Sequence, residues 1–238
     1  MIAWASVTEP TINNLANAIL VACLETDPYP ARYGNDDYLE VCTTTPGQDG
    51  FGVVLRARAA SEGPSNFLKI KKKGDLVCVS GELTLGSKDS QFDGIPIIKV
   101  FSISDASESQ YINEVTIVGR FVREAKEANL SCSRSVAVNR YIGKDQITTY
   151  FRVRGFGRLK DRIIESPKGT LVEIVGSITG AKNKEGKFYT EIKTKRLQTH
   201  QKGSGGGVQA DPAKELSAAG YEHSQFQGNQ EDSIPSNW

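Results

Sequence analysis

The sequence predicts an all-β protein made of two similar five-stranded barrels in tandem, followed by a polar tail. Three observations support this prediction. Short segments alternate between apolar and polar residues, two blocks of sequence recur, and the last residues are mostly Gly, Gln, Ser and Ala. Alternation gives a strand one buried and one exposed face, and a segment as polar as the tail cannot bury enough apolar surface to fold.

The repeated blocks indicate a tandem duplication. "GDLVCVSGELT" (74–84) and "GTLVEIVGSIT" (169–179) share Gly, Leu, Val, Gly and Thr at matching places, 95 residues apart. Upstream, "AILVACL" (18–24) has the apolar pattern of "VTIVGRF" (115–121), 97 residues apart. Two blocks in the same order at nearly the same offset are typical of internal repeats.

The second unit, residues 111–200, contains five expected strands and one helix. Leu159, Ile163 and Ile164 have helical spacing, and Pro167 ends the helix. Five strands with a short helix after the third are typical of an OB-fold barrel. The strands are expected within 113–122, 133–142, 148–156, 169–179 and 188–197, with a polar hairpin tip at 183–187.

The first unit, residues 18–104, is expected to be a degenerate copy of the same OB barrel, also with a short helix. A polar linker, "SDASESQ" (104–110), separates the two units. Residues 1–17 form an N-terminal extension, and residues 201–238 form a disordered tail with an acidic and aromatic tip.

The net charge of +1 conceals three regions of opposite sign. Residues 1–110 carry 9 Lys and Arg against 14 Asp and Glu, a charge of −5. Residues 111–202 carry 19 against 9, a charge of +10, and residues 203–238 carry −4. A basic domain of this size attracts polyanions, and an acidic tail is an internal competitor for it.

Composition argues against an enzyme, a cofactor or a metal site. The four cysteines show no CxxC pairing, and the two histidines lie in or beside the polar end. "GSGGG" (203–207) lacks the Lys-Ser/Thr of a phosphate loop. "LANAILVACL" (15–24) has no basic region before it and is too short to span a bilayer. We therefore expect a cytoplasmic, nucleoid-associated protein.

The strand at 148–156 carries the clearest candidate binding face. Alternation places Phe151 and Val153 inside the barrel, and Tyr150, Arg152, Arg154 and Phe156 on the outer face. Aromatic rings can stack on exposed bases while guanidinium groups meet phosphates, which suits single-stranded nucleic acid. In the first unit the matching strand supplies Phe51, Arg56 and Arg58 but no such alternation, and "KIKKKGD" (69–75) is its only basic cluster.

Residues 112–200 resemble the bacterial single-stranded DNA-binding protein family, through "INEVTIVGRF", "VAVNR", "YFRVRGFGRL" and "KGTLVEIVGSI" in this order and spacing. The first unit resembles the family more faintly, through "AILVACLETDPYPARY" with Asp27, Pro28, Arg32 and Tyr33. The ending "EDSIPSNW" is similar to the family's acidic Asp-Ile-Pro-Phe terminus, but closes with Ser-Asn-Trp.

The resemblance implies the same outer face and adds candidates. Tyr150 and Phe156 fall where the family places stacking aromatics, and Tyr141 lies beside another such position, occupied by Ile142. One of Phe188 and Tyr189 faces the core. The residues expected to contact DNA are Tyr150, Arg152, Arg154, Phe156, Tyr141, Arg140, Arg120, Arg123, Lys182, Lys184, Lys187 and Tyr189.

The sequence as a whole predicts a protein that binds and protects single-stranded DNA during replication, recombination and repair. Family members usually join four OB units, which implies a homodimer here. The tail tip is expected to recruit replication and repair proteins through Glu231, Asp232, Ile234, Pro235 and Trp238. The alternatives are an RNA-binding or nucleoid-associated OB protein, and a structural adaptor that has lost nucleic-acid binding.

Overall fold

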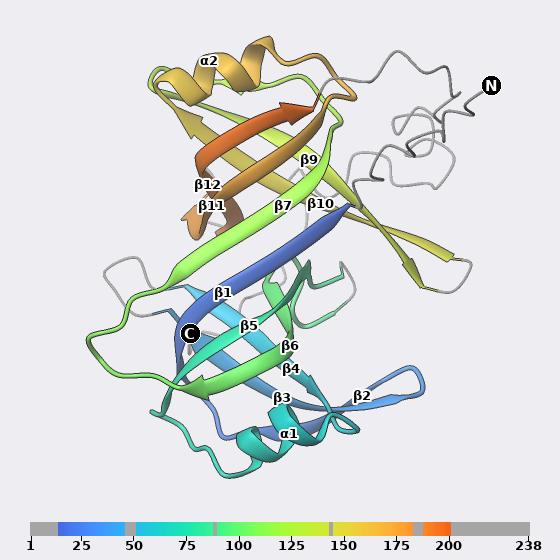
Figure 1. Ribbon diagram of the computed structural model, residues 1–238, viewed down its shortest axis with the longest axis vertical. Coiled ribbons are helices and arrows are strands. Elements are labelled where there is room, and N and C mark those ends of the chain that lie inside the picture. Colours follow the sequence, from blue (N-terminus) through green and yellow to red (C-terminus); the bar gives the residue numbers. More distant parts are fainter. Residues whose placement is uncertain (1–13, 46–50, 88–89, 143–144, 183–187, 201–238) are drawn as a thin grey trace, which may run out of the picture.

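The computed structural model describes residues 14–45, 51–87, 90–142, 145–182 and 188–200 (Figure 1). The predicted hairpin tip at 183–187 and the predicted tail at 201–238 lie outside the described residues. Most of the expected N-terminal extension does too, although the first strand already begins at Leu15.

The described residues form twelve strands and two helices, which follow one another in two sets of the same order. The first half contains β1 (Leu15–Leu24), β2 (Tyr29–Tyr33), β3 (Asp36–Thr44), β4 (Gly52–Arg58), α1 (Glu62–Lys69), β5 (Leu76–Leu85) and β6 (Pro96–Asp105). The second half contains β7 (Asn113–Phe121), β8 (Lys126–Glu127), β9 (Ser131–Ile142), β10 (Asp145–Phe156), α2 (Arg158–Glu165), β11 (Leu171–Lys182) and β12 (Phe188–His200).

Each half closes into a five-stranded barrel with OB topology. In the first half β1 pairs with β3 and β5, β3 with β4, β5 with β6, and β4 with β6 in parallel. In the second half β7, β9, β10, β12 and β11 make the same circuit, and β10 pairs with β12 in parallel. The predicted fold class is confirmed, and each half adds one short strand, β2 or β8, outside the circuit.

The two barrels share one continuous sheet. Leu15–Leu20 of β1 pair antiparallel with Asn113–Val118 of β7, so the first strands of both barrels lie side by side (Figure 1). Asn113 also donates to the carbonyl of Ile178 and accepts from its amide, both at 2.9 Å, which fixes the start of β7 on β11.

The repeated residues of the sequence occupy equivalent places in the two barrels. Gly81 and Gly176 sit at the bulge of β5 and of β11, where a Cβ would lie 2.1 and 2.4 Å from the carbonyl oxygens of Lys99 and Lys193. A side chain has no room at this step. Steric need at the same two bulges explains why this glycine recurs at an offset of 95 residues.

Helix α2 closes one end of the second barrel. Ile163 is fully buried, while Leu159 and Ile164 pack against the core, as their helical spacing predicts. The helix ends at Glu165, two residues before Pro167. The buried Arg134 donates to the carbonyls of Ile163 and Ser166, and so pairs backbone acceptors that a helix end leaves open.

The cores confirm the alternation used to predict the strands. Phe151 and Val153 of β10 are buried, with exposed fractions of 1% and 0%, beside Phe121 and Ile192. Each of the two described helices has eight residues. Among the described residues, no helix reaches the length and apolarity that a membrane crossing requires.

Candidate nucleic-acid interface

The outer side of β10 and the adjacent part of β12 carry a strip of aromatic and charged side chains. Because β10 and β12 run parallel, with Val153 opposite Ile192 and Arg154 opposite Lys193, their outward residues lie next to each other. We call this strip the β10–β12 face. It consists of Tyr150, Arg152, Arg154, Phe156, Tyr189, Glu191 and Lys193.

Cations and rings alternate along the β10–β12 face. The guanidinium carbon of Arg152 lies 4.7 Å from the centroid of the Tyr189 ring, and Lys193 Nζ lies 5.6 Å from that of Phe156. Phe156 is 41% exposed. The contact with Arg152 places Tyr189 on the outer face, which decides the orientation that the sequence left open for this residue. Rings held by neighbouring cations at a surface offer π faces and positive charge together.

A buried acid lies beneath the two arginines of this face. Glu191 is 2% exposed, its Oε2 is 2.9 Å from Arg154 Nε, and its Oε1 is 3.4 Å from Arg152 Nε. The two arginine side chains remain 24% and 34% exposed. Burial raises the pKa of the Glu191 carboxyl, against the opposing effect of Arg154 and Arg152. The site therefore contains its own counter-ion.

The β9–β10 hairpin extends the second barrel toward the first (Figure 1). Tyr141 is 69% exposed on it and donates to Gln146 Oε1 at 3.0 Å. Arg140 forms an ion pair with Glu82 of β5, in the other half of the chain. The structure therefore places Tyr141 at the surface, whereas Arg140 also fastens the hairpin to the first barrel.

The other predicted DNA contacts are distributed more widely. Arg120 is half-buried and donates to the carbonyl of Gly169 at 2.9 Å, on β7 rather than on the β10–β12 face. Arg123 follows β7, and its carbonyl accepts from Arg134. Lys182 ends β11, and Lys184 and Lys187 lie outside the described residues.

The equivalent face of the first barrel has different chemistry. The parallel pair β4–β6 places Leu55 opposite Ile98 and Arg56 opposite Lys99, as β10 and β12 place Val153 and Arg154. Counting one residue back, Val54 and Ile97 stand where the second barrel has Arg152 and Glu191. Apolar residues therefore replace a charged pair at the centre of the face.

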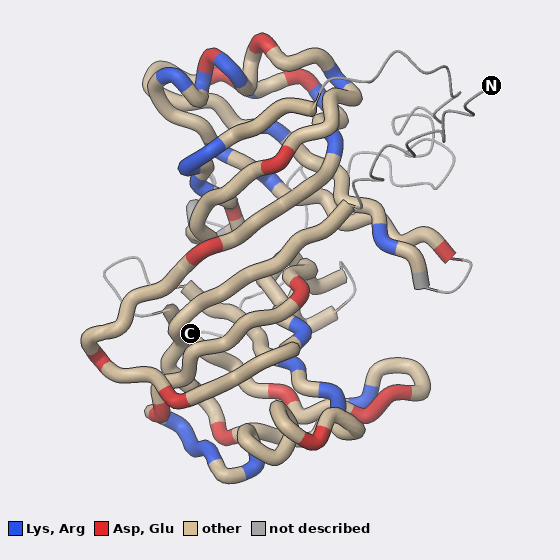
Figure 2. The backbone as a smooth tube through the Cα atoms, in the orientation of Figure 1, with Lys and Arg blue, Asp and Glu red and all other residues tan. Residues whose placement is uncertain are grey.

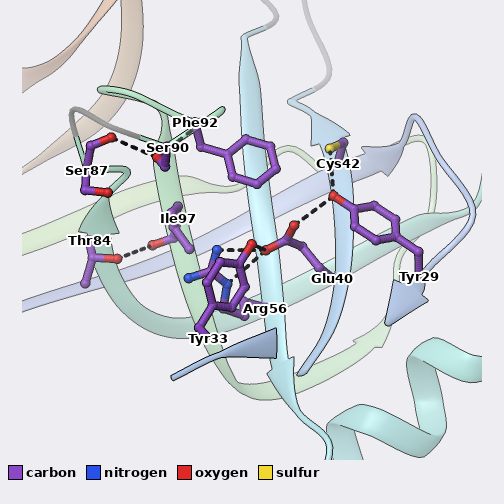
Figure 3. A network of polar contacts seen from close by, with 10 residues as sticks. All are labelled: Tyr29, Tyr33, Glu40, Cys42, Arg56, Thr84, Ser87, Ser90, Phe92 and Ile97. Carbon is purple, nitrogen blue, oxygen red and sulfur yellow. Dashed lines mark hydrogen bonds and ion pairs between the residues drawn. The ribbon is translucent and has the colours of Figure 1, made fainter. Parts of the chain in front are cut away.

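A loop of the first barrel covers this apolar centre. Phe92, from the connection between β5 and β6, packs with Cys42, Val54 and Ile97, and all four are buried (Figure 3). The amide of Ile95 donates to the carbonyl of Phe92 at 2.9 Å, which holds the loop in a tight turn. The face that could bind a ligand in the second barrel is thus covered by the chain itself in the first.

Glu40 and Arg56 pair with each other on the first face, and two tyrosines complete the network (Figure 3). Glu40 Oε1 accepts from Tyr29 Oη at 2.8 Å, and its Oε2 accepts from Tyr33 Oη at 2.7 Å and from Arg56 Nε and Nη2 at 2.9 and 2.7 Å. Arg56 also stacks on the Tyr33 ring, 3.6 Å from its centroid. Burial, then the hydrogen bond to Glu40, raises the pKa of both tyrosines.

The basic cluster of the first half lies elsewhere. Lys71 forms an ion pair with Asp105 and sits 4.6 Å from the centroid of the Phe67 ring. The amides of Lys72 and Lys73 donate to Asp75 and Asp27. These contacts shape the turn after α1, and Figure 2 shows its blue positions at the end of the first half away from the second.

Sequence reasoning missed Glu191, Lys193, Phe92 and Glu82. The composition of β12 contains a signal for the first of them, because Glu191 is the single acid in a strand whose other charged residues are basic. The sequence contains no comparable signal for Phe92 or Glu82. Their roles depend on how a loop folds back and how the two barrels meet.

Comparisons with protein-family models and with curated protein sequences find no match. Among solved structures, the wild-type single-stranded DNA-binding protein from Thermus aquaticus is similar, with 16% identity and a TM-score of 0.61, over 82% of this chain and 97% of that one. A deletion mutant of that protein matches with 16% identity and a TM-score of 0.57, over 80% and 97%. At this identity the likeness shows the fold, two OB barrels in one chain.

Proposed function

We propose that this chain is a binding protein, not an enzyme, that coats single-stranded DNA without sequence preference through the β10–β12 face and the β9–β10 hairpin. The observation that carries the proposal is the alternation of aromatic and guanidinium side chains on the outer face of the basic barrel. Each stacked base contributes about 1–3 kcal/mol whatever its identity, because every base has a π face.

The same chemistry favours single strands over duplex. Phe156 and Tyr141 present exposed rings, but the bases of a duplex already stack on one another and cannot reach them. Arg152, Arg154 and Lys193 attract any phosphate backbone, so they contribute affinity without sequence information. Salt should therefore weaken binding, and duplex should bind less tightly than a single strand of equal length.

The first barrel serves as a support for the second. Phe92 covers the centre of its equivalent face, and the charges there are paired around Glu40. Residues 1–110 also have a charge of −5, which disfavours a phosphate backbone. The contact between Glu82 and Arg140 lets this barrel hold the β9–β10 hairpin of the other.

A fluorescence titration with oligo(dT), duplex DNA and RNA of equal length tests the proposal. Tyr150→Ala combined with Phe156→Ala should weaken binding of oligo(dT) by roughly 2–6 kcal/mol if both rings stack. Tyr111→Ala is the matched control, because Tyr111 is 66% exposed in the connection between β6 and β7. Unchanged binding by the folded double variant would exclude this face, and tighter binding of RNA would favour an RNA-binding protein.

Assembly and partner recruitment complete the proposal. The chain forms a homodimer that presents four OB barrels, and light scattering should report twice 25.9 kDa. A monomer would refute this assembly.

Residues 231–238, which lie outside the described residues, dock replication and repair proteins in the nucleoid. Trp238 and Ile234 fill apolar pockets, Pro235 stiffens the chain, and Glu231 and Asp232 meet a basic rim. Deleting 231–238 should abolish capture of those proteins while preserving DNA binding. Equal capture by the truncated chain would refute the docking role.

A further inference from the structure

We infer that Glu191 is an internal counter-ion that competes with DNA phosphates for Arg152 and Arg154, and so limits the affinity of the single-stranded DNA site. This inference rests on the function proposed above and names a regulatory element of that site. Glu191 contributes no ring and no positive charge to the face, but it lowers the affinity of the face for DNA.

The geometry places the acid underneath and the cations above it. Glu191 is 2% exposed, whereas Arg152 and Arg154 keep 24% and 34% of their side chains in solvent. A phosphate can therefore approach both guanidinium groups from the solvent side without displacing the acid from the protein. It then shares with Glu191 the positive charge of the two guanidinium groups.

The ion pair between Glu191 and Arg154 is close, but two of its buried polar atoms lack an aligned hydrogen bond. Glu191 Oε1 and Arg154 Nε, both buried, have no hydrogen-bond partner, although Arg154 Nε lies only 2.9 Å from Glu191 Oε2. The carboxylate thus lies near Arg154 Nε without an aligned hydrogen bond to this nitrogen. A phosphate that accepts an aligned hydrogen bond here would therefore bind more tightly.

The first barrel provides the contrast within the same molecule. There both oxygens of Glu40 accept hydrogen bonds, and Arg56 donates two of them while stacking on Tyr33. Arg56 is only 11% exposed, so a phosphate gains little by approaching it. A buried glutamate thus locks the arginine of one barrel, but only partly neutralises the two arginines of the other.

The expected effect of removing the charge follows from counter-ion release. Glu191→Gln keeps the shape of the side chain and leaves one more unit of positive charge for the DNA. One additional phosphate contact steepens the slope of log K against log salt by about 0.7 and, at about 0.1 M salt, tightens binding about fivefold.

Titrations of the full chain with oligo(dT) over a range of salt concentrations test the inference. Glu191→Gln should bind about fivefold tighter at about 0.1 M salt with a slope steeper by about 0.7, whereas Glu191→Asp, which keeps the charge, should retain the wild-type slope. Glu173→Gln is the matched control. Glu173, on β11, forms an ion pair with Arg196 on the same barrel. Glu191 lies opposite Thr179 of β11, six residues further along that strand, so Glu173 and Glu191 are about 20 Å apart. The control should leave the slope unchanged.

The outcomes separate the inference from the proposed function. If the wild-type chain does not bind oligo(dT), the proposed function is wrong. If the wild type binds but Glu191→Gln has the same affinity and slope, the inference alone is wrong. Weaker binding by a Glu191→Gln variant with wild-type thermal unfolding would overturn it too, because Glu191 would then hold the arginines in place for DNA.

Discussion

Replacing Glu40 with Gln should destabilise the first barrel and leave single-stranded DNA binding intact. Glu40 is fully buried and accepts four hydrogen bonds, from Tyr29, Tyr33 and twice from Arg56. A glutamine has one acceptor oxygen, and its amide nitrogen only donates, so the Tyr29 hydroxyl, which donates to the carboxylate, would have to turn and accept. The substitution also removes the negative charge that offsets the buried guanidinium.

The expected loss of stability follows from the burial of both Glu40 and Arg56. Glu40 is 0% and Arg56 only 11% exposed, so the ion pair is shielded from water. Removing one partner of a buried pair costs about 3–5 kcal/mol, because the other charge stays behind without compensation. For a chain of this size each 1 kcal/mol shifts Tm by about 2–4 °C, so a decrease on the order of 10 °C is expected.

Urea and thermal unfolding measure this loss, and an oligo(dT) titration at low temperature measures binding. Asp37→Asn is the matched control in the same hairpin. The side chains of Asp37 and Arg32 are 67% and 70% exposed and lie 3.6 Å apart. Loss of this ion pair should therefore change the free energy of unfolding by less than about 1 kcal/mol. A Glu40→Gln variant as stable as the control would refute the role given to the network. Weaker DNA binding by a variant that is still folded at that temperature would show that the face of the first barrel takes part in binding.

Three further predictions concern the barrel end, the covering loop and pH. Arg134→Met removes donors to the carbonyls of Arg123, Ile163 and Ser166 and should lower the free energy of unfolding by about 2–4 kcal/mol in urea, with DNA binding unchanged. Gly86→Ala places a Cβ 1.7 Å from the Phe92 carbonyl oxygen, so the loop must move, and mass spectrometry should show faster alkylation of Cys42. Because the pKa of Glu191 is raised, the carboxyl is neutralised as pH falls toward the ordinary glutamate range, and oligo(dT) affinity should rise over that interval in the wild type but not in Glu191→Gln. Among the described side chains, the charged or titratable neighbours of Glu191 are Arg152 and Arg154 on β10 and Tyr189 and Lys193 on β12. Its partner on β11 is the uncharged Thr179.

Local pattern predicted the five barrel strands and the helix of the second half, and the part of the candidate face that lies on β10. The period of two along β10 placed Phe151 and Val153 inside and Arg152 and Arg154 outside, because alternation is a property of one strand. Glu191 could not be placed in the same way. It meets these arginines only through the parallel pairing of β10 with β12, which joins residues nearly 40 positions apart and is set by barrel closure.

Contacts between the barrels were beyond local pattern for the same reason. Arg140 is a surface arginine by sequence, and nothing near it in the chain indicates that Glu82 would be its partner. The covering of Val54 by Phe92 depends on a loop that folds back over its own barrel. Val54 lies on the outer face of its strand, and it is buried because the loop covers that face.

Duplication followed by divergence explains why the two halves differ where they do. The bulge glycines Gly81 and Gly176 recur because barrel closure requires them in both halves. The outer faces carry no such constraint, so one could become apolar and covered while the other kept its arginines. The halves have not become independent, however, because β1 pairs with β7 and Arg140 reaches Glu82. Under the proposed function, the first barrel can therefore affect DNA binding although its own outer face is covered, since Glu82 contacts the hairpin that carries Tyr141.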